Sequence, residues 1–163
     1  KELIQRAEQE LAIDEVAEFF DLAKNSKEIL YLADNAGEIA FDTLLVRELK
    51  RLGAGVRVAV KGEPIVNDAT LEDAKTVGML EVADEVVTTG TDTVGLILKE
   101  CSERFLTLYE SANLVVSKGM GHAETLTELN LKTPHILLLR TKCNPVAQFF
   151  SALRERNIAK IIP

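Results

Sequence analysis

The sequence of 163 residues has only two cysteines, no tryptophan and no long hydrophobic run. Cys101 and Cys143 are too few and too far apart to form a disulfide framework or a zinc site, so a reduced, cytoplasmic setting fits best. The longest apolar runs, such as residues 136–139, have the length of a strand, so we expect no membrane-spanning segment. No signal peptide is visible either.

Positive charge is also scarce. Lys and Arg number 19 against 26 Asp and Glu, which gives a formal net charge of −7. A nucleic-acid-binding protein needs a basic face, so this balance argues against nucleic acid as a partner. A few local lysines can still dominate one pocket, and an anionic substrate is compatible with the composition. The sequence leaves the oligomeric state open.

The remaining pattern is an alternation of short β-rich runs with longer helical stretches. Strands are predicted at residues 28–33, 56–60, 85–88, 113–117 and 135–139, with a sixth at residues 158–162, at an edge of the sheet. Helices are predicted at residues 36–52, 70–77 and 94–109, and from about residue 123. This alternation predicts an α/β fold, with a mostly parallel, Rossmann-like sheet inside a three-layer α/β/α sandwich.

The first 24 residues are expected to form one or two amphipathic helices. Their candidate core positions are Leu3, Ala7, Leu11, Val16, Phe19 and Phe20. With no internal repeat or proline-rich linker, residues 1–163 are expected to form a single domain. The chain begins without methionine, and its first residues already look helical. We therefore expect an excised or truncated piece of a longer protein, although processing would give the same start.

Polar residues gather after four of the predicted strands, at residues 34–38, 61–70, 118–124 and 140–144. In open α/β sheets, ligands bind outside the carboxyl ends of the strands. The oxygens of Asp34 and Asn35 suit a divalent cation, and Asp68 supplies a third ligand. The alternative is that Asp34 or Asn35 caps the first of these helices, and that Asn67 or Asp68 caps the next. Both roles can coexist.

Basic and glycine residues stand at the same strand ends. Lys61 and Lys118 directly follow strands and could reach phosphate oxygens, and Lys142 belongs to the same class. Each could equally be an ordinary solvated lysine. Gly119 and Gly121 precede a helix and could bind an anion through backbone amides, although such glycine pairs often only make a turn.

These segments together resemble the damage-control phosphatase family, also called domain of unknown function 89 or the acidic-residue-methyltransferase-like domain. The matching strings are DNAGE at residues 34–38, KGEPIVNDAT at 61–70, TTGTD at 88–92 and SKGMGHAET at 117–125. They follow one another in the family's order. The resemblance extends from about Leu11 to the C-terminus, and the first two strings together are specific.

The resemblance implies a metal-dependent phosphatase that removes phosphate from small phosphorylated metabolites, namely sugar phosphates or phosphorylated cofactor precursors. Its catalytic and metal-binding residues would be Asp34, Asn35 and Asp68, with Mg²⁺, Mn²⁺, Co²⁺ or Ni²⁺ as the metal. The substrate would contact Lys142 and a loop that contains Lys118, Gly119, Gly121 and Glu124. Family members normally have a longer N-terminal helical region than this chain.

Two other functions stay open. One is an S-adenosylmethionine-dependent acidic-residue methyltransferase, an activity attached to relatives of this family. The glycine-rich loop that such an enzyme would have after its first strand is absent here. The other is a non-enzymatic domain that binds a metabolite or a metal. Metal binding without turnover of any phosphate ester would favour that second alternative.

Overall fold

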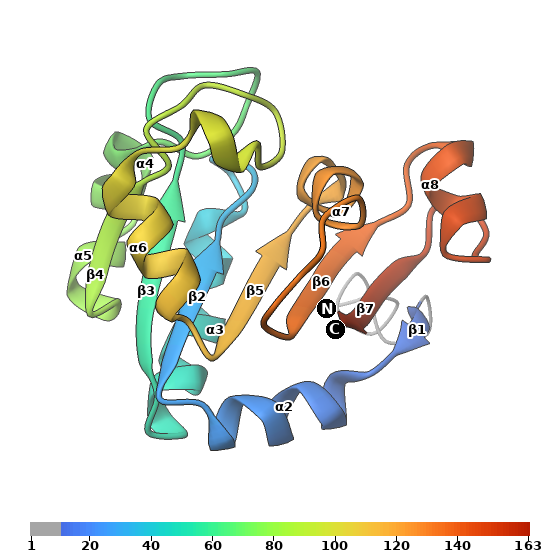
Figure 1. Ribbon diagram of the computed structural model, residues 1–163, viewed down its shortest axis with the longest axis horizontal. Helices are drawn as coiled ribbons and strands as arrows, with labels where there is room; N and C mark the ends of the chain where they lie inside the picture. The colour runs from blue at the N-terminus through green and yellow to red at the C-terminus, as the bar shows by residue number, and fades with distance from the viewer. Residues whose placement is uncertain (1–10) are drawn as a thin grey trace.

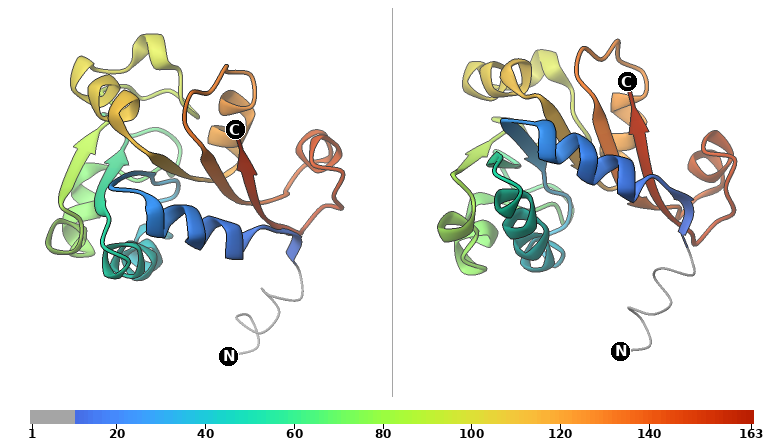
Figure 2. Two further views of the ribbon diagram at one scale, coloured as in Figure 1. Left: turned by 60° about the horizontal axis from the view of Figure 1, so that its bottom comes forward. Right: turned by 90° about the horizontal axis from the view of Figure 1, so that it is seen from below.

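The computed structural model describes residues 11–163, in which a seven-stranded sheet lies between two layers of helices (Figures 1 and 2). The strand order is β1-β7-β6-β5-β2-β3-β4. The strands are β1 (Leu11–Asp14), β2 (Glu28–Leu32), β3 (Gly55–Val60), β4 (Glu85–Thr88), β5 (Leu114–Lys118), β6 (His135–Arg140) and β7 (Asn157–Ile162). Strands β2 to β6 run parallel, whereas β7 is antiparallel to β6 and parallel to β1.

Helices cover both faces of the sheet, which confirms the predicted three-layer α/β fold. They are α2 (Val16–Asn25), α3 (Ile39–Arg51), α4 (Leu71–Thr76), α5 (Met79–Val82), α6 (Glu103–Ser111), α7 (Met120–Leu126) and α8 (Asn144–Phe149), with a 3₁₀ turn, η1 (Leu98–Glu100). Within residues 11–163, no helix is long and apolar enough to cross a membrane.

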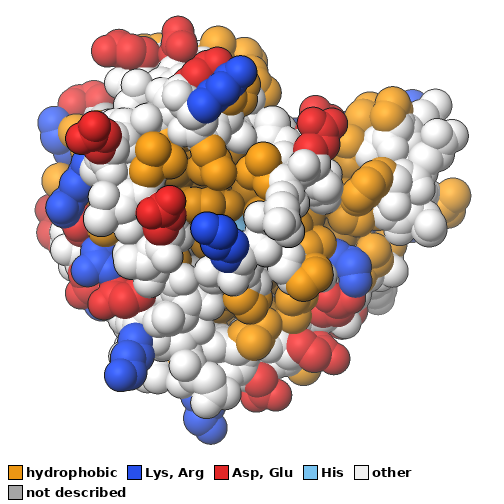
Figure 3. Space-filling model, viewed as in Figure 1, with side chains coloured by type: hydrophobic (Ala, Val, Ile, Leu, Met, Phe, Trp, Pro, Cys, Tyr) orange, Lys and Arg blue, Asp and Glu red, His pale blue; other side chains and the backbone are white. Residues whose placement is uncertain are grey.

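The sheet separates two hydrophobic cores. Side chains from α2 to α5 pack on one face, with Phe19, Ile39 and Met79 among them. Helices α6 to α8 pack on the other, with Phe105 and Leu126 fully buried. Full burial of one such side chain contributes about 1.5–3 kcal/mol. Figure 3 shows hydrophobic side chains lining a hollow in the middle of this second face.

Two predicted features at the ends of the chain are wrong. Strand β7 is not at an edge, because β1 pairs along its outer side. Leu11 therefore lies in a strand rather than a helix. Val16 and Phe19 are helical as expected, but Val16 is exposed and the prediction that it lies in the core is wrong, whereas Phe19 is buried. Glu15 joins this corner by an ion pair with Lys160, 2.7 Å long. The predicted core positions Leu3 and Ala7 lie outside the described residues.

The predicted helix at residues 94–109 is also wrong in its first half. Residues 89–97 form a loop, Gly95 has a positive φ of 73°, and α6 begins only at Glu103. Ser102 caps α6 by accepting a hydrogen bond from the backbone N–H of Phe105. The hydrophobic residues of this segment therefore belong in part to a loop in which Leu96 packs into the core while Val94 is exposed. Helices α5 and α8 were not expected from the sequence.

Candidate active site

The loops that follow β2 and β3 are joined by backbone hydrogen bonds at the carboxyl edge of the sheet, the upper edge in Figure 1. The amide of Ala69 donates to the carbonyl of Asp34 at 2.7 Å, and the amide of Ala36 donates to the carbonyl of Asn67 at 2.9 Å. An isolated antiparallel bridge also pairs Asn35 with Asp68. The parallel strands β2 and β3 therefore bring the three predicted metal ligands together, although Asn35 and Asp68 are 33 positions apart in the chain.

The side chains of these three residues do not cap the helices that follow. Helix α3 has no side-chain cap, and helix α4 is capped by Thr70, which forms a reciprocal pair of hydrogen bonds with Asp73. The alternative that Asn67 or Asp68 caps α4 is therefore wrong. Asp34 and Asp68 are half-buried carboxylates whose position is not explained by helix capping.

The pKa of Asp34 is raised to about 6, first by burial and then by the nearby carboxylates of Asp68 and Glu38. Asn35 donates through its Nδ2 to Asp34 Oδ2 at 2.7 Å. Two mutually repelling carboxylates beside an amide form an oxygen donor set that a divalent cation would neutralise. Within residues 11–163, no group of three or more His, Cys, Asp and Glu side chains is arranged for a metal. The predicted set has only two such residues plus an amide.

Lys61 points into the protein. Its Nζ donates to the carbonyl oxygens of Thr93 at 2.8 Å and Gly95 at 2.6 Å, and it lies 3.5 Å from Asp68 Oδ2. The residue is only 2% exposed, and burial lowers the pKa of its ammonium despite Asp68. These contacts hold Asp68 against the loop at residues 89–97. Contact between Lys61 and a substrate stays a prediction.

Lys118, at the end of β5, lies between two carboxylates. Its Nζ donates to Asp42 Oδ1 at 2.8 Å and to Glu38 Oε2 at 3.1 Å. Burial alone would lower the pKa of Lys118, but Asp42 and Glu38 outweigh it and raise the pKa above 10.5. Glu38 also accepts a hydrogen bond from Asn35, at 3.1 Å. Lys118 is therefore a protonated cation connected to the predicted metal ligands.

The glycines after Lys118 permit close packing at this edge. Gly119 has a φ of 82°, and a Cβ there would overlap the carboxylate of Asp34. Gly121, in the first turn of α7, packs against the backbone of Gly95. His122 is buried next, with Nδ1 2.8 Å from the carbonyl of Lys118. Burial and the charge of Lys61 lower the pKa of His122 to about 4, so it is neutral at pH 7.

Asp34 and Lys118 open into a surface groove of about 440 Å³. Its lining also includes Glu38, Gly119 and the exposed Lys142, whose charge lowers the pKa of Asp34 against the effect of burial. The groove places the exposed Lys142 and the partly buried Lys118 and Arg140 beside Asp34, the predicted metal ligand in its lining. This combination suits a phosphate ester, because its anionic oxygens pair with lysines and its organic part can extend along the groove.

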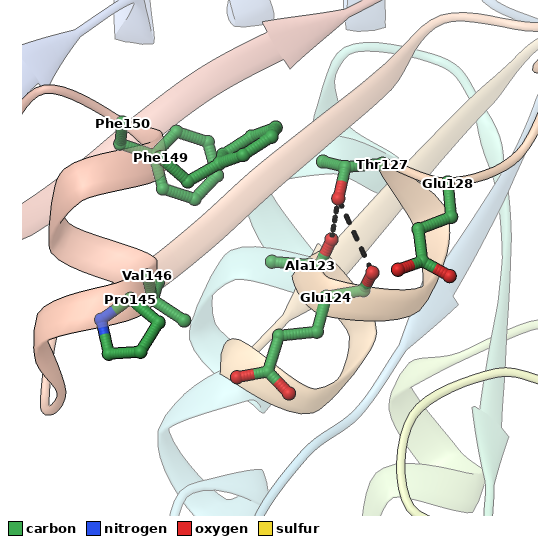
Figure 4. Close-up of a pocket in the computed structure, with 8 residues that line it drawn as sticks. All are labelled: Ala123, Glu124, Thr127, Glu128, Pro145, Val146, Phe149 and Phe150. Carbon is green, nitrogen blue, oxygen red and sulfur yellow. Dashed lines mark hydrogen bonds between the residues drawn. The ribbon is translucent and has the colours of Figure 1, made fainter.

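Glu124 does not share this groove. It lines a separate cavity of about 370 Å³ between α7 and α8, opposite Pro145 and Phe149 (Figure 4). Gly121, three residues earlier on α7, packs against Gly95 and is not among the residues that line the Asp34 groove either. Contact of Gly121 and Glu124 with a substrate stays a prediction.

Residues 1–157 match the family model described as the damage-control phosphatase ARMT1-like domain. The chain belongs to this family. It is 38% identical over 163 residues to a protein of Archaeoglobus fulgidus named damage-control phosphatase, covering 99% of this chain and 56% of the relative. It is 53% identical over 127 residues to the uncharacterized protein MJ0202 of Methanocaldococcus jannaschii, covering 77% of this chain and 41% of that protein.

A solved structure of the family agrees with the fold. The crystal structure of the DUF89 family protein PH1575 from Pyrococcus horikoshii superimposes with a TM-score of 0.87 at 37% identity, covering 91% of this chain and 52% of that one. PH1575 is itself named a damage-control phosphatase. The chain spans about half the length of the curated relatives that it matches.

The sequence reasoning missed two polar residues of this damage-control phosphatase domain, Asp42 and Tyr31. A feature of the sequence could have indicated each of them. Asp42 follows Glu38 by four residues and so lies on the same side of α3, and both bind Lys118. Tyr31 brings a hydroxyl group into an otherwise aliphatic strand, and a buried hydroxyl needs a partner.

Proposed function

We propose that this domain hydrolyses small phosphomonoesters with the help of a divalent cation held by Asp34, Asn35 and Asp68. The observation that carries the proposal is the meeting of the β2 and β3 loops, which places two carboxylates and an amide at one point. The names of the family relatives support a phosphatase. The oxygen donor set favours Mg²⁺ or Mn²⁺, and the family resemblance adds Co²⁺ and Ni²⁺ as candidates.

A bound divalent cation would supply positive charge to a phosphoryl oxygen and to the attacking water. The residues of this chain then have separate tasks. Lys118 and Lys142 bind the remaining phosphoryl oxygens and offset the charge that develops in the transition state. Lys61 holds Asp68 in place from within the protein. The groove of about 440 Å³ accepts the organic part of a small substrate, such as a sugar phosphate.

The proposal is tested by hydrolysis of p-nitrophenyl phosphate. Metal-stripped protein is assayed alone and after addition of Mg²⁺, Mn²⁺, Co²⁺ or Ni²⁺, for the wild type and for Asp34→Asn and Asp68→Asn. Asp21→Asn is the matched control, because Asp21 is an exposed aspartate on α2. We expect metal-dependent turnover in the wild type and the control, and none in the other two variants.

A panel of sugar phosphates and phosphorylated cofactor precursors then ranks substrates by kcat/KM. Turnover that persists without metal, or in Asp68→Asn, would contradict the metal assignment. Metal binding without hydrolysis of any ester would instead support the non-enzymatic alternative.

A further inference from the structure

Two buried residues outside the predicted site, Tyr31 and Asp42, anchor the ammonium group of Lys118. The hydroxyl of Tyr31 donates to Asp42 Oδ1 at 2.8 Å, and the same oxygen accepts from Lys118 Nζ at 2.8 Å. Tyr31 and Lys118 come from the adjacent strands β2 and β5, while Asp42 comes from α3 above them. Three elements therefore meet at one carboxylate oxygen.

This pair is buried and charged. Tyr31 is 0% exposed and Asp42 is 4% exposed. Burial and the charge of Asp42 raise the pKa of Tyr31 well above 10, so its hydroxyl stays protonated and donates. The second oxygen, Asp42 Oδ2, is buried without a donor among the described residues. Because a buried carboxylate needs a nearby positive charge, Asp42 and Lys118 hold each other in place.

The ammonium of Lys118 has three N–H groups. Asp42 and Glu38 accept from two of them, which leaves the third for another partner. The two carboxylates differ in exposure, since the side chain of Asp42 is 5% exposed and that of Glu38 is 47% exposed. Asp42 is therefore the fixed anchor, and Glu38 is the partner that an incoming anion can replace.

We propose that Tyr31 and Asp42 are positioning residues, which hold Lys118 so that its free N–H points into the groove and binds a phosphoryl oxygen of the substrate. The proposal rests on the proposed phosphatase function and names what orients one of its cations. Lys118 touches the substrate, whereas Tyr31 and Asp42 act only through Lys118.

The test uses Tyr31→Phe and Asp42→Asn, which remove the hydroxyl and the charge with little change in shape. The chain offers a matched control in its other tyrosine, Tyr109, whose hydroxyl lies 2.8 Å from Nε2 of His135 in the opposite core. Tyr109→Phe deletes a comparable hydroxyl far from Lys118. Two readouts are taken, the rate at which acetic anhydride acetylates Lys118 and the inhibition constant for inorganic phosphate.

We expect Tyr31→Phe to raise the acetylation rate about threefold and the phosphate inhibition constant about tenfold, with a larger change in Asp42→Asn. KM should rise and kcat should fall, because Lys118 contacts the phosphoryl group in both the bound substrate and the transition state, and Tyr109→Phe should match the wild type. In a Lys118→Met background, Tyr31→Phe should change the inhibition constant no further, because the two residues act as a unit.

Wild-type acetylation and phosphate inhibition in both Tyr31→Phe and Asp42→Asn would overturn the proposal. So would a loss of thermal stability alone, equal to that of Tyr109→Phe. If acetylation of Lys118 rises in both variants but the wild type neither hydrolyses esters nor binds phosphate, the anchoring of Lys118 is supported and the proposed function fails.

Discussion

Lys61 follows β3 and Lys118 ends β5, so both lysines stand at the carboxyl edge of the same sheet. Lys61 is 2% exposed and contacts two loop carbonyls and Asp68, whereas the side chain of Lys118 is 17% exposed and has two carboxylate partners beside an open groove. Burial dominates at Lys61 and lowers its pKa, while carboxylates dominate at Lys118 and raise its pKa. The strand register explains the difference. Leu32 pairs with both Ala59 and Ser117, so Lys118 is level with Val60, and Lys61 lies one residue further along with its side chain directed to the other face of the sheet.

The largest expected effect is the loss of activity when the aspartate near either lysine is replaced. These aspartates are Asp68, which pairs with Lys61, and Asp34, which lies beside Gly119 after Lys118. Either Asp34→Asn or Asp68→Asn should lower metal-dependent kcat/KM about 10³-fold, equivalent to about 4 kcal/mol, because the metal loses a charged ligand. Steady-state assays at saturating metal measure this. Loss in only one of the two variants would show that the β2 and β3 loops do not act together.

The second effect separates the two lysines by stability. Lys61→Met should lower the free energy of unfolding by about 3 kcal/mol, because two buried carbonyls and Asp68 lose their partner. Urea denaturation followed by circular dichroism measures it. A variant as stable as the wild type but with a greatly raised KM would contradict the structural role and restore the predicted substrate contact of Lys61.

The third effect is kinetic. Lys118→Met combined with Asp42→Asn removes the cation and its buried counter-charge together, so no buried carboxylate is left unpaired and only the exposed Glu38 loses an ion pair. We expect kcat/KM for p-nitrophenyl phosphate to fall about 30-fold, or about 2 kcal/mol, with a smaller loss of stability than in Lys61→Met. A loss of stability as large as in Lys61→Met, with little loss of kcat/KM, would show that Lys118 is structural like Lys61 and would contradict the difference between the two lysines.

The smallest effect concerns the loop of Lys61, which ends at the cap of α4. Thr70→Ala should lower the free energy of unfolding by about 1 kcal/mol near pH 7. Hydrogen bonds from Thr70 hold the pKa of Asp73 below its ordinary 3.8. Because the pKa of Asp73 is lower in the folded state than in the unfolded state, it stabilises the fold above pH 3.8. This stabilisation is lost as the pH falls below 3.8 and through the lowered pKa of the folded state. The difference from wild type should therefore shrink in denaturation curves taken below pH 3.8, and a constant difference would contradict this cause.

The sequence predicted that Asp34, Asn35 and Asp68 would lie together at the carboxyl edge of the sheet, and the bridge between Asn35 and Asp68 agrees with that placement. Their role as metal ligands stays a prediction. The sequence did not predict that Lys61 points inward, because that depends on carbonyls of the loop at residues 89–97, which the hydrophobic pattern presented as helix. It also placed Glu124 with the substrate; in the structure Glu124 lines the cavity between α7 and α8 and not the Asp34 groove, so its contact with a substrate stays a prediction.

The fold, too, was predicted correctly where local sequence determines it and wrongly where contacts between distant segments do. Strands β2, β3, β5 and β6 are buried on both faces and read as continuous apolar runs. Strand β1 has only four residues with alternating exposure, and its pairing with β7 is a contact between opposite ends of the chain. Local sequence carries little information about such a pairing, so the edge of the sheet was assigned to the wrong strand.

Calorimetric titration of Mn²⁺ into metal-stripped protein tests the central claim most directly, since it needs no knowledge of the substrate. The wild type and Asp21→Asn should bind one Mn²⁺ per chain with equal affinity, and Asp34→Asn and Asp68→Asn should each bind at least about 30-fold more weakly, a loss of about 2 kcal/mol. Wild-type affinity in either of the last two variants would contradict a metal held jointly by the ends of β2 and β3.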